Sequence, residues 1–166
     1  MKLNFFHTFL LFTAVITMNS CSSDVSATPS NTNSKMITEY SYTILENQTM
    51  DLINKYRVSI GLNSLQQINY VSLKSEEHDN YMIANNVVNH NDFVARSENI
   101  MKVLGAKTVS ENIAYNYSTP QAAVNAWLAS PGHKENIEGN FTHFGIAIRE
   151  NPANGRKYYT NIFAKI

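Results

Sequence analysis

Cysteine is almost absent from this sequence, because Cys21 is the only one among 166 residues. The fold therefore cannot contain an internal disulfide, and its stability must come from a packed core, for which the chain is long enough. Neither sign of charge is in excess, since 13 Lys and Arg residues balance 13 Asp and Glu residues. Without a basic surplus to attract a polyanion, we expect no nucleic-acid partner.

Several short catalytic and metal-binding motifs are also missing. The sequence contains no HExxH zinc helix, no GxSxG nucleophile elbow and no Gly-rich phosphate loop. Four histidines remain beyond the first twenty residues, and none belongs to a close-spaced zinc pattern: His78, His90, His133 and His143. Spacing alone therefore leaves the function open.

The long apolar run of this chain lies at its N-terminus. After Lys2, the run "FFHTFLLFTAVITM" is too short to span a bilayer comfortably and has the layout of a secretory signal peptide, which we expect over residues 1–20. Cys21 follows within "MNSCSSD", a stretch similar to the lipobox of bacterial lipoproteins, with Met18 where leucine is usual. We expect Cys21 to be the lipidation site, with simple secretion as the alternative.

Acylation of Cys21 would make the membrane a partner of this protein, because each buried CH₂ group contributes about 0.8 kcal/mol. The sequence therefore predicts an exported lipoprotein anchored at the bacterial envelope or cell surface. Residues 22–38 contain the polar stretch "SSDVSATPSNTNSK", which has no apolar period, and we expect them to be a flexible linker. The folded domain is predicted over 39–166.

The domain changes its hydrophobic period along the chain. Helical spacing of apolar residues predicts helices over 44–60, 71–88 and 95–104, and "TPQAAVNAWLA" has the N-cap and first-turn signals of a fourth. Near the C-terminus, "FGIAIRE" and "KYYTNIFAKI" flank the turn cluster "NPANG" and predict a β-hairpin. Helices first and clear strands last indicate an α+β domain, with helices packed on an antiparallel sheet.

Three polar segments form a further pattern. "VVNHND" puts His90 just past a helix, "VSENIAYN" puts Glu111 in an extended stretch, and "AVNAWLASPGHKENI" puts His133 in a turn one helix later. Together with "YRVSIGLNSL" before them and "FTHFGIAI" after them, this order resembles the CAP or SCP-like superfamily of cysteine-rich secretory, antigen five and pathogenesis-related proteins. The small bacterial branch of that superfamily is the most similar, and the resemblance covers roughly 45–166.

The resemblance implies a three-layer α–β–α sandwich with a central, mainly antiparallel sheet and a cleft on one face. In eukaryotic members, two histidines and two glutamates line this cleft, and some members bind a divalent metal there. Carried over to this sequence, these positions fall on His90, Glu111 and His133. The second glutamate position is Ser130, so a hydroxyl replaces one carboxylate of the four.

Three functions stay open at this point. The first is a cleft around His90, Glu111, Ser130 and His133 that binds an unidentified lipid, glycan or peptide. The second is a metal-dependent hydrolase of the cell envelope, because His90, Glu111 and His133 are an acceptable ligand set for zinc, with calcium and magnesium as other candidates. The third is a structural domain whose hydrogen-bonded polar cluster only holds loops. With one acid fewer, we expect weak or no metal binding and lean away from catalysis.

Other residues have simpler interpretations. We expect Trp127 in the core and His78 at the core edge, where it is compatible with helping to line the cleft. Among the three "ENI" strings, Glu98 is predicted to face solvent, and Glu135 is predicted to cap the turn after His133. Four tyrosines could rim a groove for an amphipathic ligand or simply lie on the surface: Tyr115, Tyr117, Tyr158 and Tyr159.

Overall fold

The structure is a computed structural model that describes residues 39–166. The predicted signal peptide, Cys21 and the linker 22–38 lie outside the described residues, so these three remain predictions. The elements follow in the order α1 (Ile44–Ser59), β1 (Gln66–Gln67), α2 (Asn69–Asn85), α3 (Phe93–Leu104), β2 (Thr108–Tyr115), α4 (Pro120–Ala129), α5 (Pro131–Glu138), β3 (His143–Glu150) and β4 (Lys157–Lys165).

The strands form one sheet in the order β1-β3-β4-β2. The predicted hairpin is confirmed, because β3 and β4 pair antiparallel. Strand β2 pairs antiparallel with the other side of β4 along its whole length, and the short β1 runs parallel to β3. The sheet is therefore mainly antiparallel, as expected, and β2 forms one of its edges.

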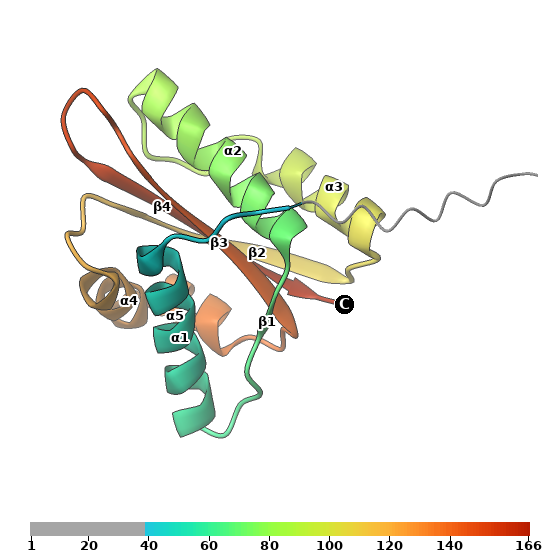
Figure 1. Cartoon of the computed structure of the whole chain (residues 1–166). Coiled ribbons are helices and arrows are strands. Elements are labelled where there is room, and N and C mark those ends of the chain that lie inside the picture. Colours follow the sequence, from blue (N-terminus) through green and yellow to red (C-terminus); the bar gives the residue numbers. More distant parts are fainter. Residues whose placement is uncertain (1–38) are drawn as a thin grey trace, which may run out of the picture. The chain divides into compact units, whose positions relative to one another are not determined.

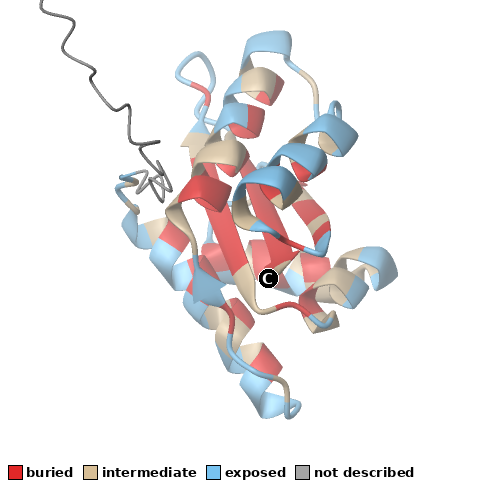
Figure 2. Cartoon of the chain, turned by 90° about the vertical axis from the view of Figure 1, so that its right-hand side faces the viewer, coloured by how far each residue is buried: buried red, intermediate tan, exposed pale blue. Residues whose placement is uncertain are grey.

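Helices cover both faces of this sheet. Helices α2 and α3 lie on one face, and α1, α4 and α5 lie on the other (Figure 1). A buried cluster containing Trp127 and Phe163 packs between the sheet and the α1–α4–α5 layer, and a second cluster with Val71 and Ile162 packs under α2 and α3. Buried residues follow the strands, while exposed residues cover the outer sides of the helices (Figure 2). The predicted three-layer α–β–α sandwich is confirmed.

Local signals set several of the helix ends. Thr43 begins α1 with a capping box, in which the Glu46 carboxylate accepts a hydrogen bond of 2.7 Å from the Thr43 backbone nitrogen. Gly105 ends α3 at the predicted position with a φ of 68°. The Thr119 hydroxyl accepts from the Ala122 backbone nitrogen and so caps α4, as the sequence predicts.

Two segments differ from the prediction. Helix α2 ends at Asn85 rather than near Val88, because Asn86 adopts the left-handed conformation with a φ of 51° and stops the helix. His133 lies in the first turn of α5 and not in a loop. Pro131 at the first helical position is compatible with a helix start, and Lys134 and Glu135 favour a helix, so the Pro-Gly pair opens a helix here.

A glycine on β3 allows α2 to pack very close to the sheet. A Cβ atom added to Gly145 would lie 2.3 Å from the backbone nitrogen of Ser72, which no side chain permits. The Ser72 hydroxyl also accepts a hydrogen bond of 3.1 Å from the backbone nitrogen of Ile146. This contact fixes α2 on the sheet, and thereby fixes the depth at which His78 of α2 enters the domain.

Candidate functional site

A groove of about 470 Å³ runs along the β2 edge of the sheet. His90 reaches it from the loop between α2 and α3. Ser130, between α4 and α5, and His133 of α5 reach it from the other side of the sheet. The rest of the wall is apolar or aromatic and consists of Val88, Ile113, Ala114, Tyr115, Tyr117, Ala126 and Trp127. The groove therefore joins the two helical layers, and it brings together three of the four predicted cleft residues.

The fourth predicted residue, Glu111, lies in the middle of β2 behind the groove. Its side chain is only 1% exposed and accepts a hydrogen bond of 2.8 Å from Nδ1 of His90. The Arg96 guanidinium of α3 binds both carboxylate oxygens, with Nε 2.8 Å from Oε2 and Nη2 3.0 Å from Oε1. Among the described residues, Glu111 forms no ion pair with His133. Of the three expected metal-ligand residues, only His90 and Glu111 are therefore in direct contact.

The charge of Glu111 determines which hydrogen-bond roles His90 can take. Burial alone would raise the pKa of the Glu111 carboxyl, but the hydrogen bond from His90 and the charge of Arg96 outweigh it and lower this pKa. An ionised carboxylate only accepts hydrogen bonds, so His90 must donate through Nδ1. Neutral His90 then carries its free lone pair on Nε2. Its side chain is 49% exposed, so this acceptor is available at the groove.

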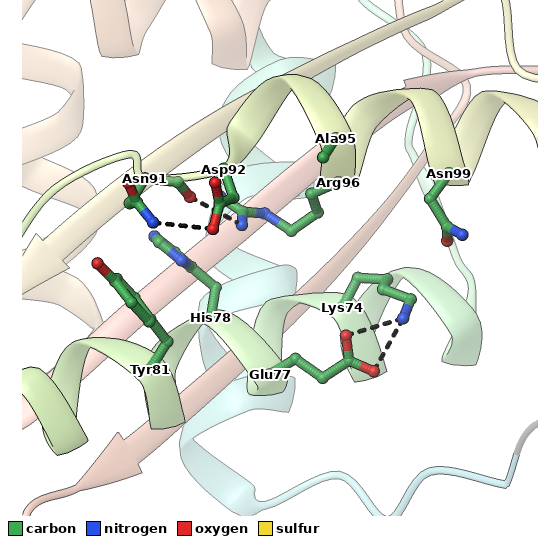
Figure 3. Close-up of a pocket in the computed structure, with 9 residues that line it drawn as sticks. All are labelled: Lys74, Glu77, His78, Tyr81, Asn91, Asp92, Ala95, Arg96 and Asn99. Atoms are coloured by element: carbon green, nitrogen blue, oxygen red, sulfur yellow. Dashed lines mark hydrogen bonds and ion pairs between the residues drawn. The ribbon is translucent and has the colours of Figure 1, made fainter.

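The backbone on both sides of His90 is tied down. Nε2 of the buried His78 donates to the carbonyl oxygen of Asn89 at 2.8 Å. On the other side, Nη1 of Arg96 donates to the carbonyl oxygen of Asn91 at 3.2 Å. Figure 3 shows His78 and Arg96 reaching this loop from α2 and α3, around a second cavity of about 280 Å³. His90 therefore lies on a loop that two neighbouring helices hold in place.

His133 has its own set of partners on the opposite side of the groove. Its Nδ1 lies 2.9 Å from the Ser130 hydroxyl. Its backbone carbonyl accepts a hydrogen bond of 2.9 Å from Asn112 of β2, and Asn112 in turn accepts from Asn136. Burial, with a smaller contribution from the charge of His90, lowers the pKa of His133. The ring is therefore neutral at pH 7.

Arg96 is the site residue that the sequence pattern did not reveal. A signal for it exists, because the helical period places Arg96 on the same face of α3 as Phe93 and the buried Ile100. A charged residue on the apolar face of a helix requires a buried partner. The sequence does not say which acid provides that partner.

Several other predictions can be checked against burial. Trp127 is 1% exposed and belongs to the core as predicted, and its Nε1 donates to the Ile113 carbonyl at the groove wall. Glu98 faces solvent, as predicted, whereas Glu135 lies exposed within α5 and not in a turn. Two tyrosine predictions are wrong: Tyr158 and Tyr159 are buried, because helices cover both faces of β4. Only Tyr115 and Tyr117 of that set line the groove.

A metal ion held by His90, Glu111 and His133 does not fit the arrangement of donors. Both oxygens of Glu111 face the Arg96 guanidinium, which is itself a cation. Between residues 39 and 166, no group of three or more His, Cys, Asp or Glu side chains is arranged to hold a metal. Binding of zinc, calcium or magnesium remains a prediction without support from this geometry, and we derive no catalytic step through a metal.

Comparisons with known proteins agree with this fold. The uncharacterized protein YkwD of Bacillus subtilis is 34% identical over 128 residues, which are 75% of this chain and 50% of that protein. The uncharacterized membrane protein YlbC of the same organism is 33% identical over 130 residues, or 74% of this chain and 35% of that protein. This chain thus spans half or less of the length of these two relatives.

A solved structure has a similar fold. An extracellular protein of Bacillus anthracis that contains an SCP domain superposes with a TM-score of 0.64 at 25% identity, over 77% of this chain and 45% of that one. The profile of the cysteine-rich secretory protein family, named CAP, matches residues 50–163. Most of the described domain lies within that match, and the chain belongs to the CAP family.

Proposed function

We propose that this chain is an exported CAP domain that binds an amphipathic ligand in the groove along β2. One observation carries the proposal: two imidazoles and a hydroxyl, from His90, His133 and Ser130, stand at a groove whose other walls are apolar and aromatic. Small-molecule sites typically combine a mostly apolar wall with a few well-placed polar groups. Binding, rather than catalysis, is the function that this arrangement supports best.

The polar groups of the groove suit a ligand that donates hydrogen bonds. Nε2 of His90 is an acceptor whenever this imidazole is neutral, and the lowered pKa of His133 favours its neutral ring beside the Ser130 hydroxyl. Hydroxyl, amide and ammonium groups can all donate to such acceptors. Tyr115 and Tyr117 also line the groove, and aromatic side chains of this kind pack against sugars and acyl chains. A glycan or a lipid with a polar head matches this combination of polar and aromatic groups.

The edge strand argues against one kind of peptide binding. Trp127 Nε1 donates to the carbonyl of Ile113, and Asn136 Nδ2 lies 3.3 Å from the carbonyl of Glu111. A peptide that binds as an additional strand must pair with the outward-facing backbone groups of β2. Side chains of this domain already occupy two of these carbonyls, which favours a glycan or lipid over a strand-forming peptide.

Binding can be tested with three probes by NMR on the mature chain carrying Cys21→Ser. The probes are a lysophospholipid below its micelle concentration, an N-acetylglucosamine oligosaccharide and an unstructured tripeptide. We expect the first or second probe to shift the indole signal of Trp127, with a weaker effect in His133→Ala. His143→Ala is the control, because His143 lies at the start of β3 and does not line the groove. If none of the probes shifts groove signals, the proposal is wrong for these ligand classes.

We further propose that the domain is held at the bacterial envelope through acylated Cys21. One relative is named a membrane protein and another an extracellular protein, and the N-terminal sequence resembles a lipoprotein signal. No helix within 39–166 combines the length and apolarity that a bilayer crossing requires. We expect the intact mass of the mature protein to include acyl chains on Cys21, and Cys21→Ser to release the protein into the medium. A mature wild-type mass without acyl chains would support simple secretion instead.

A further inference from the structure

Arg96 makes an unusually complete set of contacts for an arginine near a ligand groove. Its Nε and Nη2 donate to the two oxygens of Glu111 at 2.8 and 3.0 Å, and its Nη1 donates to the Asn91 carbonyl at 3.2 Å. The Arg96 side chain is 9% exposed and the Glu111 side chain 1%. A guanidinium that binds both oxygens of a carboxylate in this way forms a strong and directional ion pair.

This ion pair takes up the carboxylate of Glu111, which stands beside the groove. A divalent cation at Glu111 would need the same oxygen lone pairs that accept from Arg96 and His90. It would also lie close to the positive guanidinium, where screening by water is weak. Nε2 of His78 offers no substitute ligand, because it donates to the Asn89 carbonyl and lies 3.9 Å from Oε1 of Glu111.

The same arginine also fixes the position of His90. Oε1 of Glu111 accepts from both Arg96 and His90, so the guanidinium holds the carboxylate in the orientation that the imidazole needs. Its bond to Asn91 holds the backbone next to His90. Arg96 thus acts on His90 twice, through the ring and through the loop, without lining the groove itself.

We propose that Arg96 is the built-in cation of this site: its guanidinium occupies Glu111 in place of a bound metal and holds His90 with Nε2 free, so that the groove works without a divalent metal. The claim that the groove binds its ligand without a divalent metal rests on the proposed ligand-binding function. The assignment of Arg96 as a positioning residue and as a barrier to metal rests only on the contacts among Arg96, Glu111, His90 and Asn91.

The test compares zinc binding and the His90 tautomer in wild type, Arg96→Met and Arg96→Gln. Both substitutions remove the charge, and glutamine keeps hydrogen-bond donors in case methionine impairs folding. Lys102→Met is the matched control, because it removes an exposed positive charge from the same helix. Zinc alone is the probe in calorimetry on the mature Cys21→Ser chain, and long-range ¹H–¹⁵N NMR reports the tautomer.

We expect zinc affinity to rise by about tenfold or more in the folded Arg96 variants, the scale on which outer partners change metal affinity. The gain should disappear when Glu111→Gln is added, and Lys102→Met should behave like wild type. Wild-type His90 should carry its proton on Nδ1, and the Arg96 variants should show a mixture of tautomers.

Two outcomes would overturn the proposal. One is wild-type protein that binds zinc as tightly as the Arg96 variants, and the other is an unchanged His90 tautomer in a folded Arg96 variant. The proposed function fails separately, since probe binding in the groove is measured without zinc. If a probe does bind, a chelator should leave its wild-type affinity unchanged, and a loss of affinity on chelation would contradict metal-free binding.

Discussion

Two buried glutamates in this domain are each held by an arginine, and their remaining partners differ. Glu46 of α1 is fully buried, and its Oε1 accepts from Nη1 of Arg149 at 2.7 Å, from the Tyr40 hydroxyl at 2.9 Å and from the Ile148 backbone nitrogen at 2.9 Å. Its Oε2 accepts from the Thr43 backbone nitrogen. These bonds join the start of α1 to β3.

Glu111 uses the same kind of charge compensation for a different purpose. Besides Arg96, its hydrogen-bonding partner is the half-exposed imidazole of His90, which reaches a groove. A buried carboxylate with a paired arginine is therefore not evidence for a site in itself. What distinguishes Glu111 is that one of its partners is a half-exposed imidazole that lines the groove, whereas the side-chain partners of Glu46 are Arg149 and Tyr40, which do not line it.

The largest effect should come from removing the structural carboxylate. Glu46→Gln removes the buried countercharge of Arg149, which then keeps only its ion pair with the partly exposed Glu76. We expect the free energy of unfolding in urea to fall by about 3 kcal/mol, as for other broken buried pairs. The NMR signals of His90 should not change. Glu39→Gln, an exposed position, is the control and should stay within about 0.5 kcal/mol of wild type. If Glu46→Gln disturbs His90 as Glu111→Gln does, the two regions are not independent.

A smaller and pH-dependent effect is expected for Glu111→Gln. The folded pKa of Glu111 is lowered, so the unfolded chain binds the proton first as the pH falls. The stability from Glu111 is thus fully present above its unfolded pKa of about 4.3, and it is lost as the pH falls through the folded pKa. We expect Glu111→Gln to be less stable than wild type at pH 7 by about 2 kcal/mol.

Urea unfolding at a series of pH values measures this difference. The curves of wild type and Glu111→Gln should approach each other below pH 4, because protonation removes the wild-type charge there. His90 should lose its single tautomer in the variant at neutral pH. A constant stability difference over the whole acid range would show that the ionised form of Glu111 has no special role.

The sequence predicted residues that line the groove, but not the ion pair behind it. His90, Glu111 and His133 could be placed by their order within a family pattern, and three of the four predicted residues do meet at one groove. The Arg96–Glu111 pair could not be predicted, because it joins α3 to β2 through tertiary packing that no local period encodes. The short strand β1 could not be predicted either. Its two residues are glutamines, which have no β-type sequence pattern, and they form a strand because tertiary packing places them beside β3.

Local signals failed where two of them compete. "SPGH" contains a Pro-Gly pair, which typically marks a turn, and also a Ser-Pro pair, which typically starts a helix. The helix prevails here, so His133 projects from the first turn of α5. Tyr158 and Tyr159 illustrate another limit, since strand alternation indicates an exposed face only when one side of the sheet is open.

The smallest effect should come from Ser130→Ala, which acts on the other side of the groove. The Ser130 hydroxyl faces His133 Nδ1 and does not cap the backbone of α5, so its loss should cost less than a usual N-cap, about 0.5 kcal/mol. We expect His133 to lose its preferred ring orientation by NMR, while His90, held by Glu111 and Arg96, stays unchanged. Ser118→Ala, in the exposed loop before α4, serves as the control. A matching change at His90 would mean that the two imidazoles are held by one network, and the groove would then have one polar wall and not two.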